Sequence, residues 1–167
     1  MKLDEKIWDE VDAIVPSWMS KNEANFLVEN TEGGTYVEIG VAFGKSLRII
    51  RNHFPEMSVT GIDKINHGVQ QKVPFAKVIL GDANEIVKDF TDESIDTLFI
   101  DGDHTYNGCM KDFIMWYPKV KKGGSIIFHD YQRDNNHIGV THCVHAIKPL
   151  LQDFKSISYI CAGKKPN

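Results

Sequence analysis

The chain has 167 residues and a formal net charge of −4, a size that fits one domain with a single core. Apolar residues make up 42% and charged residues 25%, as in ordinary soluble proteins, and no Lys/Arg stripe marks nucleic acid as a partner. No stretch approaches the roughly 18 apolar residues of a membrane span, and the charged start MKLDEKIWDE does not resemble a signal peptide.

The first 30 residues are helical in pattern. Apolar residues recur at helical spacing from Trp8 to Val15, where Pro16 interrupts them. A second helix is predicted over residues 21–29, closed by the Gly-Gly pair that follows it.

Short apolar segments then alternate with helical ones. The predicted elements are a strand at 35–39, a helix at 46–54, strands at 59–62 and 76–80, a helix at 84–90, a strand at 95–100, a helix at 106–120, a Gly-Gly turn at 123–124, a strand at 125–128, a helix at 140–154 and a strand at 157–161. This order predicts a Rossmann-like, doubly wound α/β fold, with a mainly parallel sheet and helices on both faces.

No repeat or linker divides the chain, so one domain is predicted over residues 1–167. Residues 1–30 form its N-terminal helices and residues 35–161 its Rossmann-like core. The three cysteines, Cys109, Cys143 and Cys161, are odd in number and lack paired metal spacing. They indicate reduced thiols and a cytoplasmic protein.

Acidic residues mark the ends of five predicted strands. They are Glu38, Asp63, Asp82, Asp101 and Asp130. One such acid is usually a solvated surface group, because Asp and Glu are mostly exposed. Five at the carboxyl edge of one parallel sheet, where ligands bind in such folds, favour a binding site.

The first loop, from Gly40 to Gly44, is built for close approach of a ligand to the backbone. The helix that begins near Ser46 directs free N–H groups toward it. The G-x-G-x-x-G fingerprint is absent, and Ile39 stands where a phosphate P-loop needs its first glycine. The loop therefore suits a nucleoside-like ligand that needs no pyrophosphate cradle.

Two later acids fit the rest of such a ligand. Asp63 follows Gly44 by 19 residues, and a carboxylate there can accept both hydroxyl protons of a ribose. Asp82 can accept from an adenine amino group, while the N–H of Ala83 donates to a ring nitrogen.

Four motifs resemble class I S-adenosylmethionine-dependent methyltransferases. They are V-E-I-G-x-x-x-G-x-S at 37–46, Gly81-Asp82-Ala83, F-I-D-G-D-H-T-Y at 99–106 and H-D-Y at 129–131. The last two resemble a small subgroup related to macrolide-sugar O-methyltransferases and, more distantly, to catechol O-methyltransferase. The resemblance implies S-adenosylmethionine as cofactor and O-methylation of a small-molecule hydroxyl.

The resemblance also implies roles for individual residues. The cofactor-binding residues would be Glu38, Gly40, Ala42, Phe43, Gly44, Ser46, Asp63, Asp82, Ala83 and Asp101. His104 would be the catalytic base, with Asp101 beside the transferred methyl. In metal-using members, acids at the positions of Asp101 and Asp130 bind Mg²⁺.

Two departures from the family pattern stand out. Tyr131 occupies the position of a metal-binding Asn in the catechol-type enzymes. The chain is also short at its C-terminus, which predicts that the usual C-terminal strand pair is truncated, with one strand missing. A shortened sheet edge would favour a homo-oligomer.

Several other side chains have structural explanations. Strand alternation predicts that His129 points away from Asp130. His137, His142 and His145 lack a third ligand and are interpreted as partly exposed polar residues. Phe43 and the tryptophans are expected to pack, although Trp18 also has a position from which it could cover the cofactor mouth.

Two rival functions remain open at this stage. An NAD-dependent oxidoreductase shares the sheet and the ribose acid, but it predicts the missing pyrophosphate loop. A non-catalytic S-adenosylmethionine-binding module is favoured by the small size and would bind cofactor without methylating any acceptor.

Overall fold

The computed structural model describes residues 1–69, 73 and 76–167. These residues form a seven-stranded sheet with the order β3-β2-β1-β4-β5-β7-β6. The strands are β1 Thr35–Ile39, β2 Ser58–Asp63, β3 Lys77–Leu80, β4 Ile95–Ile100, β5 Val120–Phe128, β6 Gln152–Ile157 and β7 Ile160–Lys164. The first five pair in parallel, and β7 runs antiparallel to both β5 and β6. The Rossmann-like fold is confirmed.

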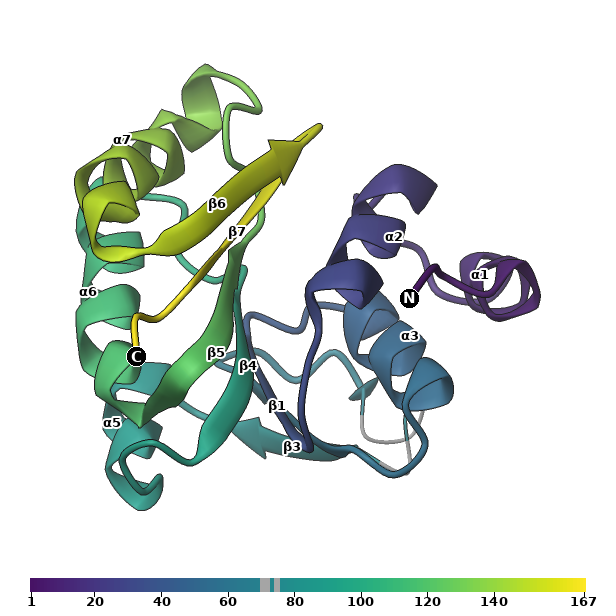
Figure 1. Ribbon diagram of the computed structural model, residues 1–167. Helices are drawn as coiled ribbons and strands as arrows, with labels where there is room; N and C mark the ends of the chain where they lie inside the picture. The colour runs from purple at the N-terminus through teal and green to yellow at the C-terminus, as the bar shows by residue number, and fades with distance from the viewer. Residues whose placement is uncertain (70–72, 74–75) are drawn as a thin grey trace.

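Helices cover both faces of this sheet (Figure 1). One face carries α1 Glu5–Asp12, α2 Lys21–Asn30 and α3 Lys45–His53, and the other carries α5 Ala83–Ile86, α6 Tyr106–Trp116 and α7 Ile138–Ile147. Helix starts follow the local sequence. Ser20 and Glu23 form a reciprocal capping box at α2, and the Thr105 hydroxyl accepts from the Gly108 N–H at α6.

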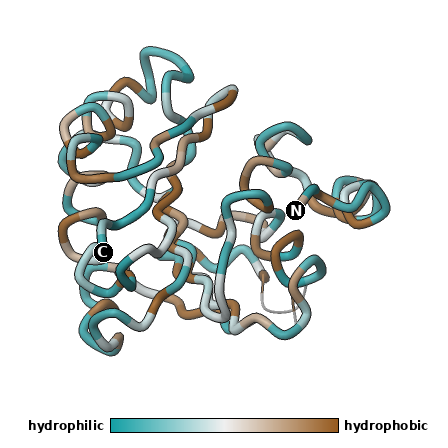
Figure 2. Tube along the Cα trace, viewed as in Figure 1, coloured by the Kyte–Doolittle hydropathy of each residue, from teal (hydrophilic) through white to brown (hydrophobic). Residues whose placement is uncertain are grey.

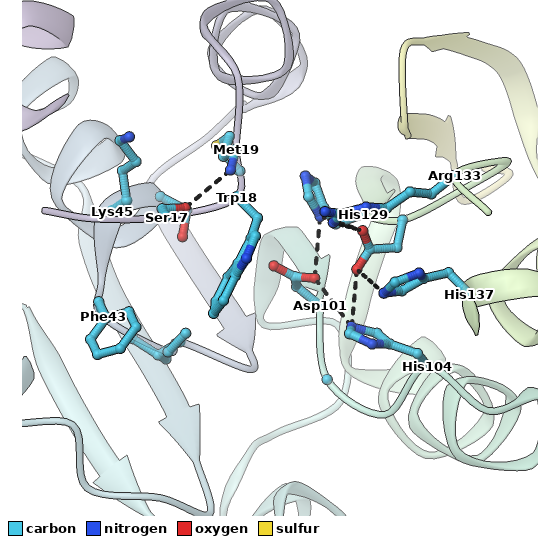
Figure 3. Close-up of a pocket in the computed structure, with 15 residues that line it drawn as sticks. Ser17, Trp18, Met19, Phe43, Lys45, Asp101, His104, His129, Arg133 and His137 are labelled. Carbon is cyan, nitrogen blue, oxygen red and sulfur yellow. Dashed lines mark hydrogen bonds and ion pairs between the residues drawn. The ribbon is translucent and has the colours of Figure 1, made fainter. Parts of the chain in front are cut away.

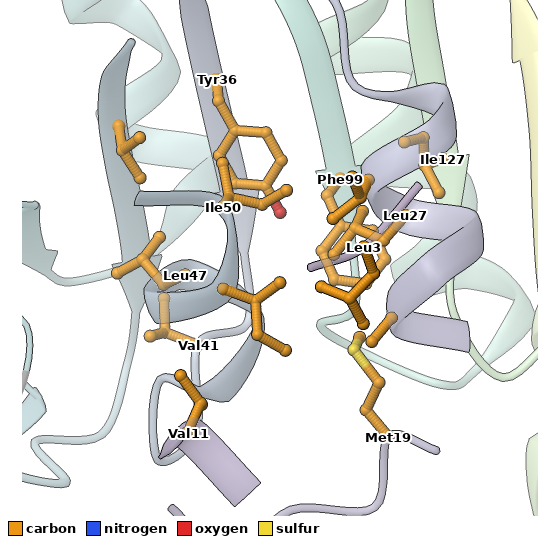
Figure 4. Close-up of a cluster of buried hydrophobic side chains, with 14 of the residues drawn as sticks. Leu3, Val11, Met19, Leu27, Tyr36, Val41, Leu47, Ile50, Phe99 and Ile127 are labelled. Atoms are coloured by element: carbon orange, nitrogen blue, oxygen red, sulfur yellow. The ribbon is translucent and has the colours of Figure 1, made fainter. Parts of the chain in front are cut away.

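The central strands send alternate side chains into two cores. Tyr36, Phe99 and Ile127 enter the core shared with α1, α2 and α3 (Figure 4), whereas Leu98 and Ile126 enter the core under α6 and α7. In Figure 2 the brown of hydrophobic residues marks parts of these central strands. Fully burying a side chain of this size stabilises the fold by about 1.5–3 kcal/mol, so the two cores hold the carboxyl ends of the strands at fixed positions.

The predicted truncation of the C-terminal strand pair is wrong, because both β6 and β7 are present. The predicted helix at 140–154 ends at Ile147, and the predicted strand at 157–161 straddles the turn between β6 and β7. The sequence signal failed because β6 is an edge strand whose residues are mostly exposed and polar. A complete pair removes the reason for expecting a second copy to cover a shortened edge.

The predicted turn at Gly123 and Gly124 is also wrong, because both glycines lie within β5. The pairing of β4 and β5 is irregular between Ile95 and Thr97. A Cβ on Gly124 would lie 3.0 Å from the Asp96 carbonyl oxygen. Gly124 thus permits a close backbone approach within the strand. Among the described residues, no helix has the length and apolar character needed to cross a membrane.

Candidate active site

The loops at the carboxyl edge of the sheet enclose two adjoining cavities, of about 470 and 340 Å³. Ala42, Asp101 and Gly102 line both of them and form their common wall. We call the larger cavity the nucleoside chamber, for the ligand that the sequence predicts there, and the smaller one the histidine chamber, for the histidines that line it. Both volumes lie in the range typical of small-molecule sites.

The nucleoside chamber brings together the ends of β1, β2, β3 and β4. Its lining residues include Gly40, Asp63, Asp82, Ala83 and Asp101. Gly40 has φ +83°, and a Cβ there would collide with the carbonyl oxygen of Asp101. Only glycine allows β1 and β4 to end so close together, which keeps this part of the chamber wall free of side chains.

Asp63 fixes the first loop. Its Oδ2 accepts from the N–H groups of Val41 and Ala42 at 2.8 and 2.9 Å, and its Oδ1 accepts from Ile65 N–H at 2.9 Å. A carboxylate has about four acceptor positions, so a hydroxyl-bearing ligand would share this group with the loop.

Asp82 lines the nucleoside chamber just after β3, the strand next to β2, and its carboxylate accepts from Asn84 N–H at 2.9 Å. This hydrogen bond lowers the pKa of Asp82, and Lys64 Nζ at 3.3 Å adds to the effect. Asp82 is therefore an anionic acceptor at neutral pH.

Glu38 lines neither chamber, but it is hydrogen-bonded to Ser46, which lines the histidine chamber. Its buried carboxyl accepts from the Tyr36 hydroxyl at 2.7 Å and the Ser46 hydroxyl at 2.6 Å. Burial is the main cause that raises the pKa of Glu38 to about 8; the charges of Asp101 and Asp63 contribute to this rise, and the two hydrogen bonds oppose it. Ser46, by contrast, lines the histidine chamber, as do Ala42 and Phe43.

The histidine chamber holds a charged cluster centred on Asp130 (Figure 3). Oδ2 of Asp130 lies 3.0 Å from His104 Nε2, and Oδ1 lies 2.5 Å from Arg133 Nη1 and 3.3 Å from His129 Nδ1. Asp101 Oδ1 lies 3.4 Å from His129 Nδ1 and 3.9 Å from His104 Nε2. Burial alone would raise the pKa of Asp130, but its partners hold that pKa well below the ordinary range.

The prediction that His129 points away from Asp130 is wrong. The two side chains meet because the chain leaves β5 after Phe128 and Asp130 adopts φ +59°, which ends the strand alternation. Burial opposes protonation of His129, yet the carboxylates of Asp101, Asp130 and Glu23 together raise its pKa well above 6.5.

His104 is the more accessible histidine of the cluster, with its side chain 40% exposed. Its hydrogen bond to Asp130 raises its pKa above 6.5. An imidazole held by one carboxylate and open to a cavity has the features of a general base.

The cluster includes residues that the sequence did not single out. Arg133 and His137 line the chamber, and His137 Nε2 lies 4.0 Å from Asp130 Oδ2. Glu23 caps α2, yet it also approaches His129 Nε2 at 3.9 Å. The S-x-x-E pattern of the capping box is visible in the sequence, but the approach of Glu23 to His129 depends on the tertiary structure.

The donor set does not suit Mg²⁺. Asp101, His129 and Asp130 offer ligand atoms within 4.8 Å of one another, as do His104, Asp130 and His137. Mg²⁺ requires near-octahedral oxygen ligands, whereas these groups are rich in imidazole, and Arg133 already neutralises Asp130.

Tyr131 supplies no further oxygen to this set. Its hydroxyl lies 3.2 Å from His145 Nε2, and its ring packs against Phe154 in the other core. Tyr131 lines neither chamber.

A family profile described as a methyltransferase domain matches residues 37–131, more than half of the chain. The chain belongs to this methyltransferase family. The matched segment of the methyltransferase domain runs from β1 to the end of β5 and so contains Gly40, Asp63, Asp82, Asp101 and Asp130.

Two curated relatives are each 34% identical to this chain over the aligned residues, 114 in one and 85 in the other. One is an uncharacterized protein of Acanthamoeba polyphaga mimivirus, matched over 59% of this chain and 52% of its own length. The other is an uncharacterized protein of Sinorhizobium fredii, matched over 49% of this chain and 9% of its own length. The match thus spans about half or less of these relatives.

Solved methyltransferases share the fold. The MycE methyltransferase of the mycinamycin pathway, solved with Mg, SAH and mycinamycin VI, has a TM-score of 0.73 and 16% identity over 97% of this chain and 53% of its own. An O-methyltransferase from Bacillus cereus, in complex with SAH, has a TM-score of 0.66 and 17% identity, and the match covers 96% of this chain and 90% of its own. A SAM-dependent O-methyltransferase from Thermotoga maritima has a TM-score of 0.72 and 12% identity, and the match covers 96% of this chain and 71% of its own. With the family match, they confirm the resemblance noted from the motifs.

Proposed function

We propose that this domain transfers a methyl group from S-adenosylmethionine to a hydroxyl group of a small molecule. The observation that carries the proposal is the common wall of Ala42, Asp101 and Gly102. A nucleoside held in one chamber would extend its sulfur-bearing tail along this wall, toward the chamber that contains His104.

The nucleoside chamber has the volume and the polar groups to hold adenosine. Asp63 and Asp82 line it at the ends of the neighbouring strands β2 and β3, and Gly40 leaves room for close approach. In the proposal, Asp63 accepts from the ribose hydroxyls, while Asp82 and the N–H of Ala83 bind the adenine.

The remaining first-motif residues would hold the tail of the cofactor. Gly44 begins α3 with φ +81°, and Ser46 lies in the first turn of this nine-residue helix. Free N–H groups at such a helix start favour a carboxylate. Ala42 and Phe43 line the wall beside it, and Glu38 positions the Ser46 hydroxyl through their hydrogen bond.

The bound cofactor supplies an activated methyl on a sulfonium, which passes to the acceptor oxygen as the carbon–sulfur bond breaks. His104 accepts the proton that this oxygen loses. With its Nε2–H donated to Asp130, the imidazole keeps Nδ1 as its basic position. The buried Asp130 carboxylate then stabilises the imidazolium, and Asp101 lies on the wall between the two reactants.

The decisive experiment measures cofactor binding and turnover separately. Calorimetric titration with S-adenosylhomocysteine is expected to show binding that Asp63→Asn and Asp82→Asn each weaken about tenfold or more, a loss typical of a charged hydrogen-bond acceptor. Asp92→Asn is the matched control, because Asp92 is an exposed acid paired with Lys119 outside both chambers. NADH binding with no S-adenosylhomocysteine binding would refute the cofactor assignment.

Turnover tests the chemistry. With a methylated acceptor found in a hydroxyl panel, His104→Ala is expected to lower kcat by about 10²–10⁴-fold, the usual contribution of a general base. His142→Ala is the control, since His142 is exposed on α7. Cofactor binding with no methylation of any acceptor would favour a non-catalytic binding module instead.

A further inference from the structure

Two imidazoles converge on one oxygen of Asp130. Its Oδ2 lies 3.0 Å from His104 Nε2 and 4.0 Å from His137 Nε2. Its other oxygen, Oδ1, is engaged by Arg133 and His129. The rings of His104 and His137 are neighbours, with centroids 4.7 Å apart, and Figure 3 shows lines from both rings to the same carboxylate. Two nitrogen donors and one oxygen donor thus lie within 4.8 Å of one another.

His137 is oriented by a second carboxylate. Its Nδ1 lies 2.7 Å from Asp134 Oδ1, and the Asp134 carboxylate is itself held by the N–H of Asn136 at 2.8 Å. With the proton on Nδ1, the lone pair of His137 is on Nε2, the atom that faces Asp130. A histidine that binds a metal through one ring nitrogen usually donates the N–H of the other to a carboxylate. His137 therefore has the orientation of a metal ligand.

This donor set suits a divalent transition metal. Two histidines and one carboxylate are a set that Zn²⁺ uses in proteins, with bonds of about 2.0–2.2 Å and a fourth position left open. The donors line the histidine chamber, where water can take that position. The present distances are longer than those of a bound set, but His104 is 40% exposed and can turn toward an ion without leaving a packed core.

The set differs from the magnesium position that the family resemblance implies. That position uses Asp101 and Asp130, the acids that follow β4 and β5. The set described here leaves out Asp101 and is completed by His137. Both His137 and the orienting Asp134 lie beyond residues 37–131, the segment that the methyltransferase profile matches. The family match therefore does not account for this set.

We propose that His104, Asp130 and His137 bind one Zn²⁺ ion, and that this ion inhibits methyl transfer. His104 would give its Nε2 lone pair to the ion, and the ring proton that Nε2 shared with Asp130 would move to Nδ1. The ring would then have no position left to accept the proton of an acceptor hydroxyl. The inhibition rests on the proposed function, because it depends on His104 as the base, whereas the metal site rests on the geometry alone.

The test measures metal binding on the whole chain after EDTA treatment and desalting. Near neutral pH, Zn²⁺ is titrated against a chromophoric chelator that competes for the ion, and Co²⁺ is titrated in parallel as a spectroscopic probe. We expect one Zn²⁺ per chain. We expect Co²⁺ to give the visible bands of a four- or five-coordinate site, without the near-ultraviolet band that binding to a cysteine thiolate would add. Excess Mg²⁺ should displace neither ion.

Four substitutions locate the ion. His137→Ala is expected to weaken Zn²⁺ binding more than about 100-fold and Asp134→Asn about tenfold, since residues that orient a ligand contribute about 10–100-fold. His142→Ala is the matched control, as an exposed histidine of α7 that lines neither chamber, and should change the dissociation constant less than about twofold. Asp101→Asn tests the magnesium position and should change it less than about threefold.

Turnover gives the second measurement. With a methylated acceptor, Zn²⁺ is expected to inhibit the wild type with the dissociation constant that the titration gives. His137→Ala should need more than about 100-fold more Zn²⁺ for the same fractional inhibition. Each rate with Zn²⁺ is compared with the rate of the same protein without it, so a change in basal activity does not enter the comparison.

Each contrary outcome is distinct. Zn²⁺ that does not bind, that still binds to His137→Ala with unchanged affinity, or that only Asp101→Asn displaces would overturn the metal site. Zn²⁺ that binds as expected and leaves the rate unchanged would overturn the inhibition. A chain that binds Zn²⁺ through His137 and methylates no acceptor would support the metal site and count against the proposed function.

Discussion

The imidazole of His104 lies 3.0 Å from the carboxylate of Asp130, and the Asp130 side chain is only 3% exposed. The ion pair favours the charged form of the ring, so the hydrogen bond to Asp130 raises the pKa of His104 above its ordinary 6.5. In the proposed mechanism, the contact with Asp130 therefore sets both the basicity of His104 and its protonation state.

The pH dependence of turnover should report this contact. Only neutral His104 accepts a proton, so kcat/KM is expected to fall as pH drops below the raised pKa, with an acid limb above 6.5. Asp130→Asn removes the charge and should move this limb to lower pH, whereas His142→Gln should leave it in place. A limb that stays unmoved in the Asp130 variant would assign it to another group.

Buried Glu38 should make stability depend on pH. Its folded pKa of about 8 lies above the ordinary 4.5, so the unfolded chain ionises first and folding loses free energy as pH rises between these values. The loss is at most about 4–5 kcal/mol. The Glu38→Gln variant has no carboxyl at this position to ionise. Urea unfolding at pH 5 and at pH 8 should therefore show that the unfolding free energy of the wild type falls, relative to that of the variant, as the pH rises. A constant difference would mean that Glu38 is ionised at both pH values or at neither.

Gly40 should tolerate no side chain. Gly40→Ala is expected to cost about 2 kcal/mol or more in unfolding free energy, through positive φ and a clash with the Asp101 carbonyl. Gly34→Ala is the control, because a Cβ there meets nothing within 4 Å, and it should stay within about 0.5 kcal/mol. Thermal unfolding of the two variants and the wild type measures both changes in stability. Equal melting temperatures would show that the β1–α3 loop adapts to the methyl group.

Turnover should not require Mg²⁺. Mg²⁺ is typically bound through one or two carboxylates together with water, and here the Asp130 carboxylate is already paired with Arg133 and His104, which compete with an ion for it. Rates measured after EDTA treatment and after adding Mg²⁺ are expected to agree within about twofold, a negligible difference in activation free energy. A rate lost in EDTA and restored by Mg²⁺ would instead place the ion between Asp101 and Asp130.

Local sequence patterns predicted most of the scaffold. Strands such as β1 and β4 are largely buried and rich in β-branched and apolar residues, and their predicted bounds match the structure to the residue. The edge strand β6 escaped detection because water solvates its residues and no apolar pattern is needed there.

The sequence predicted the site residues that directly follow a strand. It did not predict the contacts that form where segments distant in the sequence meet. Asp63, Asp82 and Asp101 stand at strand ends, so chain order alone places them at one edge. The direction of His129 depends on the positive φ of Asp130, and the proximity of Glu23 depends on the packing of α2. Neither has a signal in a single sequence.

Glu23 also joins parts of the chain that lie far apart in sequence. Its carboxylate accepts from Ser20 N–H and from Tyr159 N–H in the β6–β7 turn, and it approaches His129 beside the reactive cluster. The opening thirty residues lie outside the matched family segment, yet Glu23 braces the end of it that carries His129. A truncation that starts at residue 31 would remove the Glu23 contacts to His129 and to the β6–β7 turn, so a shortened chain is expected to lose the proposed activity before it loses its sheet.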